Sequence, residues 1–526
     1  MHAGLQRRLS TWRSVQHDHR MFLGVLLLAA TLRAVVVYTY RPAFFFTGDS
    51  VVYLENSVHL VPGTARPVGY AVLLRVILTT HNLMLVPVVQ HTLGLVVATI
   101  TYALLVHLGV ARGIAVLGAV FVLFDPLQLV LEENILSESL FQILIVSSLA
   151  LLVWNKRPVL WQCALVGLGL AASALTRNVG GVLILPVVAY ALVRRFGWRR
   201  VVIILLAFVI PLLGYAGWYD KTNGEFALQG YSGRFLYGRV APFARCAGLH
   251  LPSIDRTLCT ATGLRSPWPT WYVFGPPSPF NEKPLASDPS VDRIAQSFAV
   301  QVILHQPIDY ASAVTSDLLS FFKPARSTGP DADPINVDFV FRSDHLTAYP
   351  SPLISSWIRQ ADASRTENAT IVHPLASALI FWQRWFYFPG PIFALALLGG
   401  FAGMVGRTRG HLRRLGAEGV LYSACSLLLL LAPVATVVFD YRFLVPVLPL
   451  LGTSGAIGLT VLLDHVARHR RNRGATDVRP EPATAQAGVE RADSQGDGAW
   501  IVTRCAPSSA SSLCVGLRAP QPNRVT

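Results

Sequence analysis

Apolar stretches close to membrane-spanning length recur along the chain, and they constrain its fold more than any other feature. The hydrocarbon core of a bilayer is about 30 Å thick, so a spanning helix needs about 20 mostly apolar residues. We predict spans at residues 21–40, 83–107, 113–128, 137–154, 159–176, 180–193, 201–218, 385–405, 418–437 and 442–464. With 52% hydrophobic and 14% charged residues, the chain carries more apolar surface than a water-soluble fold can bury. The sequence therefore predicts an all-α polytopic membrane protein with about ten transmembrane helices.

The positions of the basic residues predict the orientation of these spans. Short cytoplasmic loops accumulate Lys and Arg. Basic clusters precede the first predicted span and follow the fourth, sixth, eighth and tenth. Because the number of spans is even, we expect a multi-pass protein of the cell membrane with both termini in the cytoplasm. The same clusters account for the net charge of +15, so we expect no nucleic-acid partner.

This orientation places two long segments on the outer face. The first outer loop, 41–82, contains an apolar stretch at 66–78 that is too short to span, and we expect an interfacial helix there. The second segment contains a helical stretch at about 290–322, broken near Pro307. The predicted regions are a cytoplasmic N-terminal segment (1–20), a transmembrane catalytic module (21–218), a small, mostly helical extracytoplasmic domain (219–384), C-terminal transmembrane helices (385–464) and a disordered cytoplasmic tail (465–526).

Cysteines and soluble-enzyme motifs exclude several classes of function. Cys246 and Cys259 share the predicted outer domain, where oxidation can occur, and the sequence leaves open whether they form a disulfide. Cys163 and Cys425 lie within predicted spans, where packing is their simplest role. The chain has no P-loop, no dinucleotide-binding glycine motif and no HExxH zinc motif, which argues against a nucleotide-driven pump.

Asp49 stands where the chain leaves the first predicted span, directly after Gly48 and near three phenylalanines at 44–46. Two interpretations are open. Asp49 or Ser50 could cap the helix that follows. The carboxylate could instead act at the height of the lipid phosphates, with the phenylalanines among the acyl chains and headgroups.

Several motifs, in this order along the chain, resemble those of one enzyme family. They are "GDSVVYLENS" after the first span, "RPVGY" (66–70), "FDPLQLVLEENILSESLF" (124–141), "ALTRNVGGVLILP" (174–186), "LHQPIDYASAVTSDLLSFF" (304–322) and "DYRFLVPVLPLL" (440–451). The pattern resembles the GT-C superfamily of membrane glycosyltransferases that use polyprenyl-phosphate sugars, such as protein O-mannosyltransferases and lipid A aminoarabinose transferases. The resemblance covers about residues 20–464. It implies an inverting transfer of a hexose or pentose from a polyprenyl-phosphate carrier to an extracytoplasmic protein, wall polysaccharide or lipid glycan.

The resemblance also implies roles for two acidic residues. Asp49 matches the family's general base, and burial near the phenylalanines would raise its pKa. Glu138 matches a second acidic position and would orient the acceptor or, with Asp49, hold a divalent cation. The alternative for Glu138 is a solvated residue that caps its span. Some relatives have a second acid directly after the Asp, and here that position is Ser50, so no metal ligand is assigned and no cofactor is expected with certainty.

Basic and aromatic residues in the matching motifs are candidates for substrate binding. Arg177 and Arg442 suit a lipid phosphate, since guanidinium groups bind phosphate oxygens in pairs. The alternative for each is an arginine that snorkels to the interface. Tyr70 and Tyr441 could line the sugar pocket or belong to the interfacial aromatic belt. Arg239, in the outer domain, could bind an anionic acceptor or the carrier phosphate, or belong to a small core.

Two other functions are considered beside the transferase. A lipid-linked glycan ligase would use closely related chemistry. A polytopic transporter, or flippase, would share the apolar composition but should show repeated halves or helices broken at matching positions. We find no such symmetry in the sequence.

Overall fold

The computed structural model describes residues 2–46, 48–263, 269–276, 278–326, 339–343, 370–402 and 411–476. The chain divides into two units, residues 1–469 and 470–526. Within the described residues almost all regular structure is helical, and the only sheet pairs β1 (Tyr40–Arg41) with β2 (Thr370–Ile371) in antiparallel fashion. The predicted all-α polytopic fold is confirmed.

Five described helices are long and apolar enough to cross a membrane. They are His19–Thr39 within α1 (His2–Thr39), α4 (Leu85–His107), α10 (Trp198–Asn223), Leu415–Thr436 within α19 (His411–Thr436), and Tyr441–Arg470, which joins η5 (Tyr441–Val447) to α20 (Leu448–Thr476). Two bent pairs also pass this test together: α5 (Arg112–Phe124) with α6 (Pro126–Glu133) at 47°, and α17 (His373–Trp385) with α18 (Gly390–Ala402) at 55°.

The remaining three predicted spans are shorter apolar helices. They are α7 (Glu138–Trp154), α8 (Leu160–Thr176) and the continuous pair η1 (Asn178–Leu183) and α9 (Ile184–Val193). Each of the ten predicted segments therefore contains helix, while length and composition support five to seven spans in the described part of the chain. The last helix runs on to Thr476, beyond its predicted end at 464.

The bend between α5 and α6 follows from two adjacent residues. Asp125 leaves the helical conformation, and its carboxylate accepts a hydrogen bond from the backbone N–H of Leu127 at 3.0 Å. Pro126, at the first position of α6, cannot donate a backbone hydrogen bond and has a backbone angle suited to starting a helix. A new helix therefore begins in the middle of the apolar segment, and it carries Glu132 and Glu133 into the protein interior.

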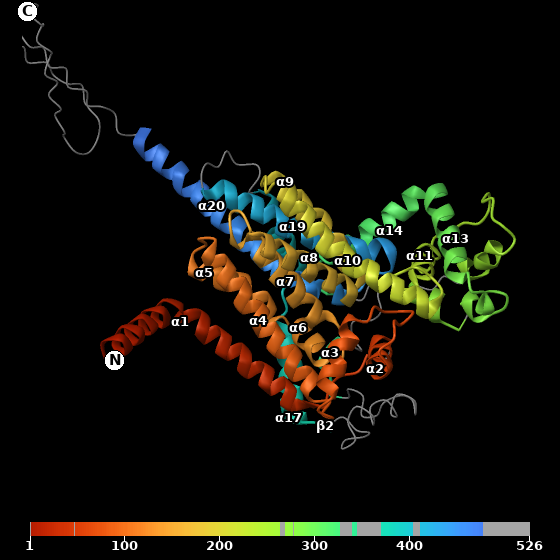
Figure 1. Ribbon diagram of the computed structural model, residues 1–526, viewed down its shortest axis with the longest axis horizontal. Coiled ribbons are helices and arrows are strands. Elements are labelled where there is room, and N and C mark those ends of the chain that lie inside the picture. Colours follow the sequence, from red (N-terminus) through yellow and green to blue (C-terminus); the bar gives the residue numbers. More distant parts are fainter. Residues whose placement is uncertain are drawn as a thin grey trace, which may run out of the picture. The chain divides into compact units, whose positions relative to one another are not determined.

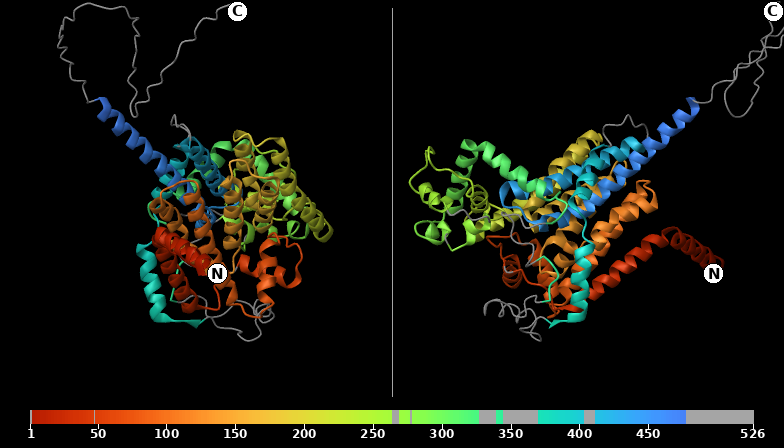
Figure 2. Two further views of the ribbon diagram at one scale, coloured as in Figure 1. Left: turned by 60° about the vertical axis from the view of Figure 1, so that its left-hand side comes forward. Right: turned by 180° about the vertical axis from the view of Figure 1, so that it is seen from behind.

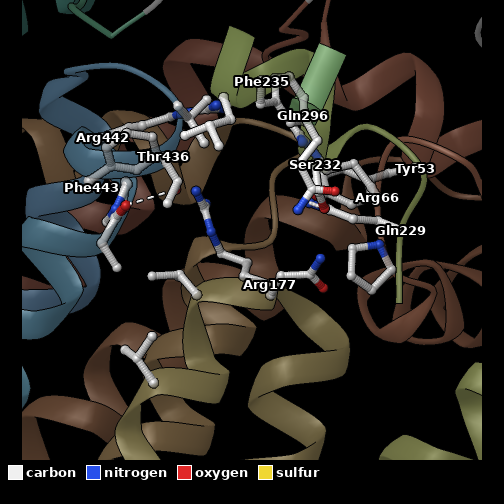
Figure 3. Close-up of a pocket in the computed structure, with 18 residues that line it drawn as sticks. Tyr53, Arg66, Arg177, Gln229, Ser232, Phe235, Gln296, Thr436, Arg442 and Phe443 are labelled. Carbon is white, nitrogen blue, oxygen red and sulfur yellow. Dashed lines mark hydrogen bonds between the residues drawn. The ribbon is translucent and has the colours of Figure 1, made fainter. Parts of the chain in front are cut away.

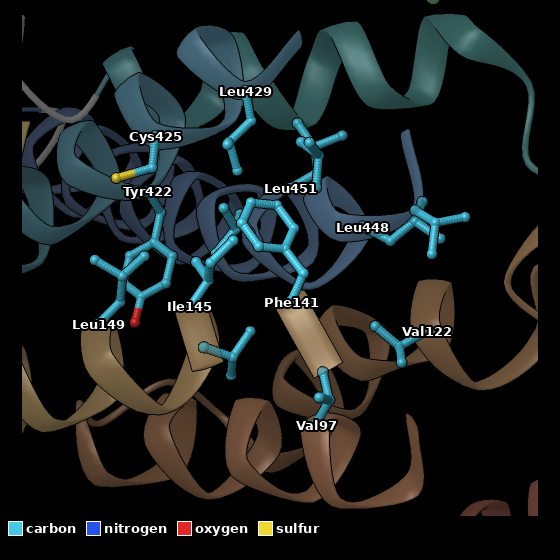
Figure 4. Packing of buried hydrophobic residues seen from close by; sticks show 14 of the residues in the cluster. Val97, Val122, Phe141, Ile145, Leu149, Tyr422, Cys425, Leu429, Leu448 and Leu451 are labelled. Carbon is cyan, nitrogen blue, oxygen red and sulfur yellow. The ribbon is translucent and has the colours of Figure 1, made fainter. Parts of the chain in front are cut away.

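Helices from both halves of the sequence pack together in one apolar core. Phe141, Ile145 and Leu149 of α7 lie between α4 on one side and α19 and α20 on the other (Figure 4). The helices approach closely where glycines face each other: a Cβ on Gly452 would lie 1.9 Å from the carbonyl oxygen of Gly118. Such close backbone approach favours helix association in membranes, where lipid is as apolar as the side chains. The views from two sides show these helices in the same bundle (Figures 1 and 2).

Two short helices follow the first span. α2 (Asp49–His59) begins at the predicted candidate base, and α3 (Gly69–Leu78) coincides with the predicted interfacial stretch. Tyr70, Ala71 and Leu74 of α3 are buried, whereas Val72 and Val76 are exposed. The helix therefore has one face packed on the protein and one apolar face left open.

Residues 224–326 contain a group of helices with a hydrophobic core of its own, which we call the α11–α14 region. Its elements are α11 (Ser232–Val240), η2 (Asp255–Gly263), α12 (Pro269–Phe274), η3 (Pro279–Asn281), η4 (Leu285–Ser287), α13 (Val291–His305) and α14 (Pro307–Ser320). The predicted break at Pro307 is confirmed. Tyr237, Leu258, Tyr272 and Phe298 are buried together. Cys246 and Cys259 form a disulfide.

Candidate active site

Asp49 is buried at the start of α2 and contacts two arginines. Its Oδ1 accepts hydrogen bonds from Nε and Nη2 of Arg66, at 3.0 and 2.8 Å. Its Oδ2 accepts a hydrogen bond from Nη1 of Arg442 at 2.6 Å, across 393 residues of sequence. The N-cap of α2 is Gly48 and no side chain caps the helix, so the capping interpretation of Asp49 and Ser50 is wrong.

Arg442 is held in place by the residues around it. Asp440, the N-cap of η5, accepts a hydrogen bond from the backbone N–H of Arg442 at 2.9 Å, and its carboxylate lies 2.9 Å from Nε of the same arginine. The guanidinium lies over the rings of Phe46 and Phe443, 5.3 and 5.4 Å from their centroids. The sequence predicts phenylalanines among the acyl chains and headgroups, but the rings of Phe44 and Phe45 are buried in the protein.

Glu138 and Arg177 form a second ion pair beside the first. Glu138 is fully buried at the start of α7, and its Oε1 accepts a hydrogen bond from Nη1 of Arg177. The expectation of a solvated Glu138 is therefore wrong. Its other oxygen, Oε2, has no hydrogen-bond partner in the part of the chain that the structure describes. Arg442 also interacts electrostatically with Glu138, and Arg177 with Asp49, so the two pairs form one charged cluster.

The arginines of this cluster face a cavity of about 420 Å³. Arg66, Arg177 and Arg442 line it, whereas Asp49 and Glu138 are not part of its lining and lie behind the guanidinium groups. Arg177, the residue between α8 and η1, reaches into the middle of the opening, with Arg442 on one side and Arg66 on the other (Figure 3). The cavity therefore presents cations to a ligand, and each cation is backed by a carboxylate.

The rest of the lining divides by chemistry. Polar groups come from α2, η1, the α11–α14 region and the end of α19: Tyr53, Asn178, Gln229, Ser232, Gln296 and Thr436. Apolar groups come mainly from η1 and from the end of α19: Val179, Val182, Ala432, Pro433 and Val437. One cavity thus offers guanidinium groups, hydrogen-bonding side chains and an apolar wall to the same ligand.

The arginines reverse the expected effect of burial on Asp49. Burial by itself raises the pKa of the Asp49 carboxyl, but Arg66 and Arg442 outweigh this effect and hold the pKa well below its ordinary value. The expectation of a raised pKa is therefore wrong, and the carboxylate is ionised at neutral pH. Burial, together with the nearby charge of Asp49, raises the pKa of Tyr53 to about 12, so the phenol that lines the cavity is neutral.

Three of the predicted substrate-binding residues lie outside the cavity lining. Tyr70 is buried, donates to Oε1 of Gln90 at 2.9 Å and packs edge-on against Tyr53. Tyr441 is buried against Phe321 and Phe439. Arg239 is buried in α11, where its Nη1 donates to Asp317 of α14 at 2.5 Å.

Arg66 lines the cavity, although its sequence motif does not by itself indicate this role. It begins the "RPVGY" motif, and the signal that could indicate its role is a cation 17 residues after Asp49 in the same outer loop. Gln229, Ser232 and Gln296 could not be found in this way, since polar residues of these types occur throughout the chain.

The donor set at this point does not fit the divalent cation considered from the sequence. Both oxygens of Asp49 and one oxygen of Glu138 already contact guanidinium groups. Among the described residues, no group of three or more His, Cys, Asp or Glu side chains is arranged to hold a metal ion.

Comparisons with known proteins give one family match. Residues 75–220 match the model of the dolichyl-phosphate-mannose-protein mannosyltransferase family. No curated protein matches the chain.

Two solved structures resemble the chain at low similarity. One is the archaeal oligosaccharyltransferase AglB from Archaeoglobus fulgidus in complex with an inhibitory peptide and a dolichol-phosphate, with 13% identity and a TM-score of 0.37. The other is the Archaeoglobus fulgidus oligosaccharyltransferase in its apo form, with 12% identity and a TM-score of 0.34. Each alignment covers 87% of this chain and 52% of the other, so the chain spans about half the length of these structures.

The matched segment, 75–220, begins within α3 and ends within α10. It includes Glu138 and Arg177 but not Asp49, Arg66 or Arg442. Over this segment, the resemblance to GT-C-type membrane glycosyltransferases that the sequence motifs indicated is confirmed.

Proposed function

We propose that this protein is an integral-membrane glycosyltransferase that moves one sugar from a polyprenyl-phosphate carrier to an acceptor outside the cytoplasmic membrane. The observation that carries the proposal is the cavity lined by Arg66, Arg177 and Arg442. Guanidinium groups bind phosphate oxygens through paired, charge-assisted hydrogen bonds. The apolar wall suits the first units of a prenyl chain, and the amide and hydroxyl groups suit a sugar. The mannosyltransferase family match agrees with this class of donor.

The transfer needs three events in one step. An acceptor hydroxyl oxygen bonds to the anomeric carbon, while the bond from that carbon to the phosphate oxygen breaks. The electron pair leaves with the polyprenyl phosphate, whose added negative charge the three guanidinium groups stabilise. The acceptor proton moves to a base. A single displacement of this kind inverts the anomeric configuration.

Asp49 is our candidate for the base. Its carboxylate is ionised, which is the form that a base requires, but Arg66 and Arg442 lower its basicity in the ligand-free protein. A donor phosphate competes for the same guanidinium groups. Binding of the donor would therefore free part of the carboxylate and raise its basicity when the acceptor arrives.

Glu138 has a different role in this proposal. Its Oε1 orients Arg177, and its Oε2 has no hydrogen-bond partner among the described residues. Glu138 is therefore placed to hold Arg177 toward the donor phosphate. The acceptor would be a protein, a wall polysaccharide or a lipid glycan.

The test uses the purified full-length protein in lipid with a panel of radiolabelled polyprenyl-phosphate sugars and membrane extract as acceptor. Wild type is compared with Asp49→Asn and with Glu55→Gln, a matched control at an exposed position of the same helix. We expect transfer of one sugar, a fall of about 10²-fold or more in kcat for Asp49→Asn, and no change for Glu55→Gln.

Each other outcome has a defined meaning. Unchanged transfer by Asp49→Asn would remove this carboxylate from the chemistry. Movement of the lipid-linked sugar across the bilayer without transfer would favour a flippase. Transfer of a preassembled glycan, but of no single sugar, would favour a ligase.

A further inference from the structure

A second charged cluster lies inside the helix bundle, apart from the cavity lining. Arg33 of α1, His91 of α4, and Glu132 and Glu133 of α6 are all at most 3% exposed. All four belong to predicted spans or to the bent α5 and α6 pair. Ionisable groups at membrane depth are costly, so they call for a specific partner and a specific role.

Arg33 joins three helices at the bend. Its Nε and Nη2 donate to the two carboxylate oxygens of Glu132 at 2.9 and 3.0 Å. Its Nη1 and Nη2 donate to the carbonyl oxygens of Leu123 and Val122, both at 2.9 Å, which lie in the last turn of α5. Arg33 thus satisfies carbonyl groups that the break in the helix leaves open, and it does not snorkel to the interface.

His91 bridges the two glutamates. Its Nδ1 lies 2.6 Å from Oε2 of Glu132, and its Nε2 lies 3.0 Å from Oε2 of Glu133. Carboxylates accept but do not donate hydrogen bonds, and a neutral imidazole carries only one N–H. A neutral imidazole can therefore donate only one of these two bonds. Both bonds form only if the His91, Glu132 and Glu133 group carries one additional proton. With that proton and with Arg33, the four side chains have no net charge, which lowers the cost of burying them.

Gln90 connects the cluster to the backbone at the end of α6. Its Nε2 donates to the carbonyl oxygens of Glu132 and Asn134, at 2.9 and 2.6 Å. Its Oε1 accepts from the hydroxyl of Tyr70, which packs against Tyr53 at the cavity. The amide is fully buried, so each of these bonds is costly to lose.

Residues 132–138 form direct hydrogen bonds with the residues around Asp49. The N–H of Phe44 donates to the carbonyl of Glu133 at 2.9 Å, and the N–H of Ile135 donates to the carbonyl of Phe44 at 3.0 Å. The hydroxyl of Ser50, next to Asp49, donates to the carbonyl of Ile135 at 2.9 Å.

The same segment then leads to Glu138. Ser137, the residue before Glu138, lies 2.9 Å from the hydroxyl of Tyr53 through its Oγ. A shift of the segment at 132–138 would therefore move both carboxylates that support the cavity arginines.

We propose that Arg33, Gln90, His91, Glu132 and Glu133 form a positioning element that fixes residues 132–138 and thereby places Asp49 and Glu138 behind the cavity. Its effect on sugar transfer rests on the proposed function, whereas its effect on local structure does not. Placement matters because a displacement of about 1 Å at a reacting group can lower a rate about 10²-fold.

Gly94 allows a test that removes no polar group. A Cβ at this position would lie 1.8 Å from Oε1 of Glu132 and 3.2 Å from Nη2 of Arg33, so Gly94→Ala pushes the ion pair apart. Gly24→Ala, in α1, is the matched control because nothing lies within 4 Å of its added Cβ. Glu133→Gln is a second variant, which keeps the side-chain shape but removes the shared charge.

The experiment measures amide hydrogen exchange and transfer kinetics of the full-length variants in lipid nanodiscs. For Gly94→Ala and Glu133→Gln we expect exchange about tenfold faster in peptides covering 44–50 and 132–138, and unchanged exchange across 291–305. We expect kcat to fall about 10²-fold, with KM changed less than about threefold, and Gly24→Ala to match wild type.

Unchanged exchange in the two segments would overturn the proposal, and so would exchange that is faster by the same factor at 291–305. Failure of both variants to fold would assign the cluster to general stability and would also overturn it. If the wild type transfers no sugar, the proposed function falls, and the exchange data still decide whether the cluster positions the two segments.

Discussion

Arg442 and Arg239 are both buried beside an aspartate, yet of the two only Arg442 lines the cavity described above. Arg442 is 8% exposed and Arg239 is 4% exposed. Arg442 contacts Asp49 on one side and lines the opening with its guanidinium group. Arg239 joins α11 to α14 through Asp317 and lies outside the lining. A buried arginine–carboxylate pair is thus not a site by itself, and the open volume beside the guanidinium makes the difference.

The two regions also differ in what they must stabilise. The α11–α14 region has its own apolar core and a disulfide, and it contributes Ser232, Phe235 and Gln296 to the cavity. Its buried ion pair serves that local fold. The cavity cluster instead keeps three cations close together, which requires the carboxylates of Asp49, Glu138 and Asp440 behind them.

The comparison predicts that Arg239 matters for stability. Loss of one partner from a buried ion pair costs about 3–5 kcal/mol, because the other charge is left in a poor environment. We expect Arg239→Ala to lower the free energy of unfolding by that amount, and Arg239→Met with Asp317→Leu to recover most of it. Denaturant unfolding in detergent measures both. A loss of transfer by Arg239→Ala without a loss of stability would instead place Arg239 with the cavity residues.

The second prediction concerns Arg66, the most exposed of the three cavity arginines. Removal of one group that stabilises charge in a transition state costs about 10²–10³-fold in rate, or about 2.7–4 kcal/mol. We expect Arg66→Ala to lower sugar transfer by that factor while Asp49 keeps its contact with Arg442. The control is Arg75→Ala, since Arg75 donates to the carbonyls of Ser57 and Val58 outside the cavity lining. Equal losses in the two variants would count against a phosphate site.

The third prediction tests the independence of the α11–α14 region. The disulfide of Cys246 and Cys259 closes a sequence separation of 13 residues, and a loop of that length is worth about 3 kcal/mol in the chain-entropy model. We expect the double alanine variant to lose about that much stability, measured by thermal unfolding with and without a reductant. The transfer rate of the folded fraction should not change. A change in KM for the donor would show that the region shapes the cavity more directly than its separate core suggests.

The smallest expected effect is a dependence of stability on pH at Asp49. The pKa of this carboxyl is lowered in the fold, so the unfolded chain takes up the proton first as the pH falls. The stabilisation is present above the unfolded pKa of about 3.9 and is lost as the pH falls below it. We expect the difference in Tm between wild type and Asp49→Asn to be constant from about pH 8 to 5 and to shrink below about pH 4. A raised pKa would instead show as wild type gaining stability relative to Asp49→Asn as the pH falls from about 8 to 6.

Several residues of the charged cluster at the cavity stand in short sequence motifs, and each of these motifs lies at a helix end. Asp49 begins α2, Glu138 begins α7, Arg177 follows α8, and Arg442 is the second residue of η5. Arg239 and Tyr441 also stand in polar or aromatic motifs, but both are buried and lie outside the lining of this cavity. Sequence patterns show which residues lie near an element boundary, and they do not show which way a side chain faces.

The expected pKa of Asp49 was wrong for a related physical reason. Burial could be inferred from the local sequence, and burial does raise the pKa of a carboxyl. The opposing contribution comes from Arg66 and Arg442, of which the second is 393 residues away in the chain. Long-range electrostatic partners of this kind depend on the whole helix packing.

The sequence by itself determined the helical membrane fold, the break at Pro307 and the resemblance to lipid-phosphate glycosyltransferases. These properties depend on local composition, on backbone chemistry and on short motifs. Only the tertiary structure decided which arginines share a cavity, that Arg66 is one of them, and that Arg33 and His91 hold the segment behind Asp49. These contacts join residues far apart in sequence, and their existence depends on how the helices pack.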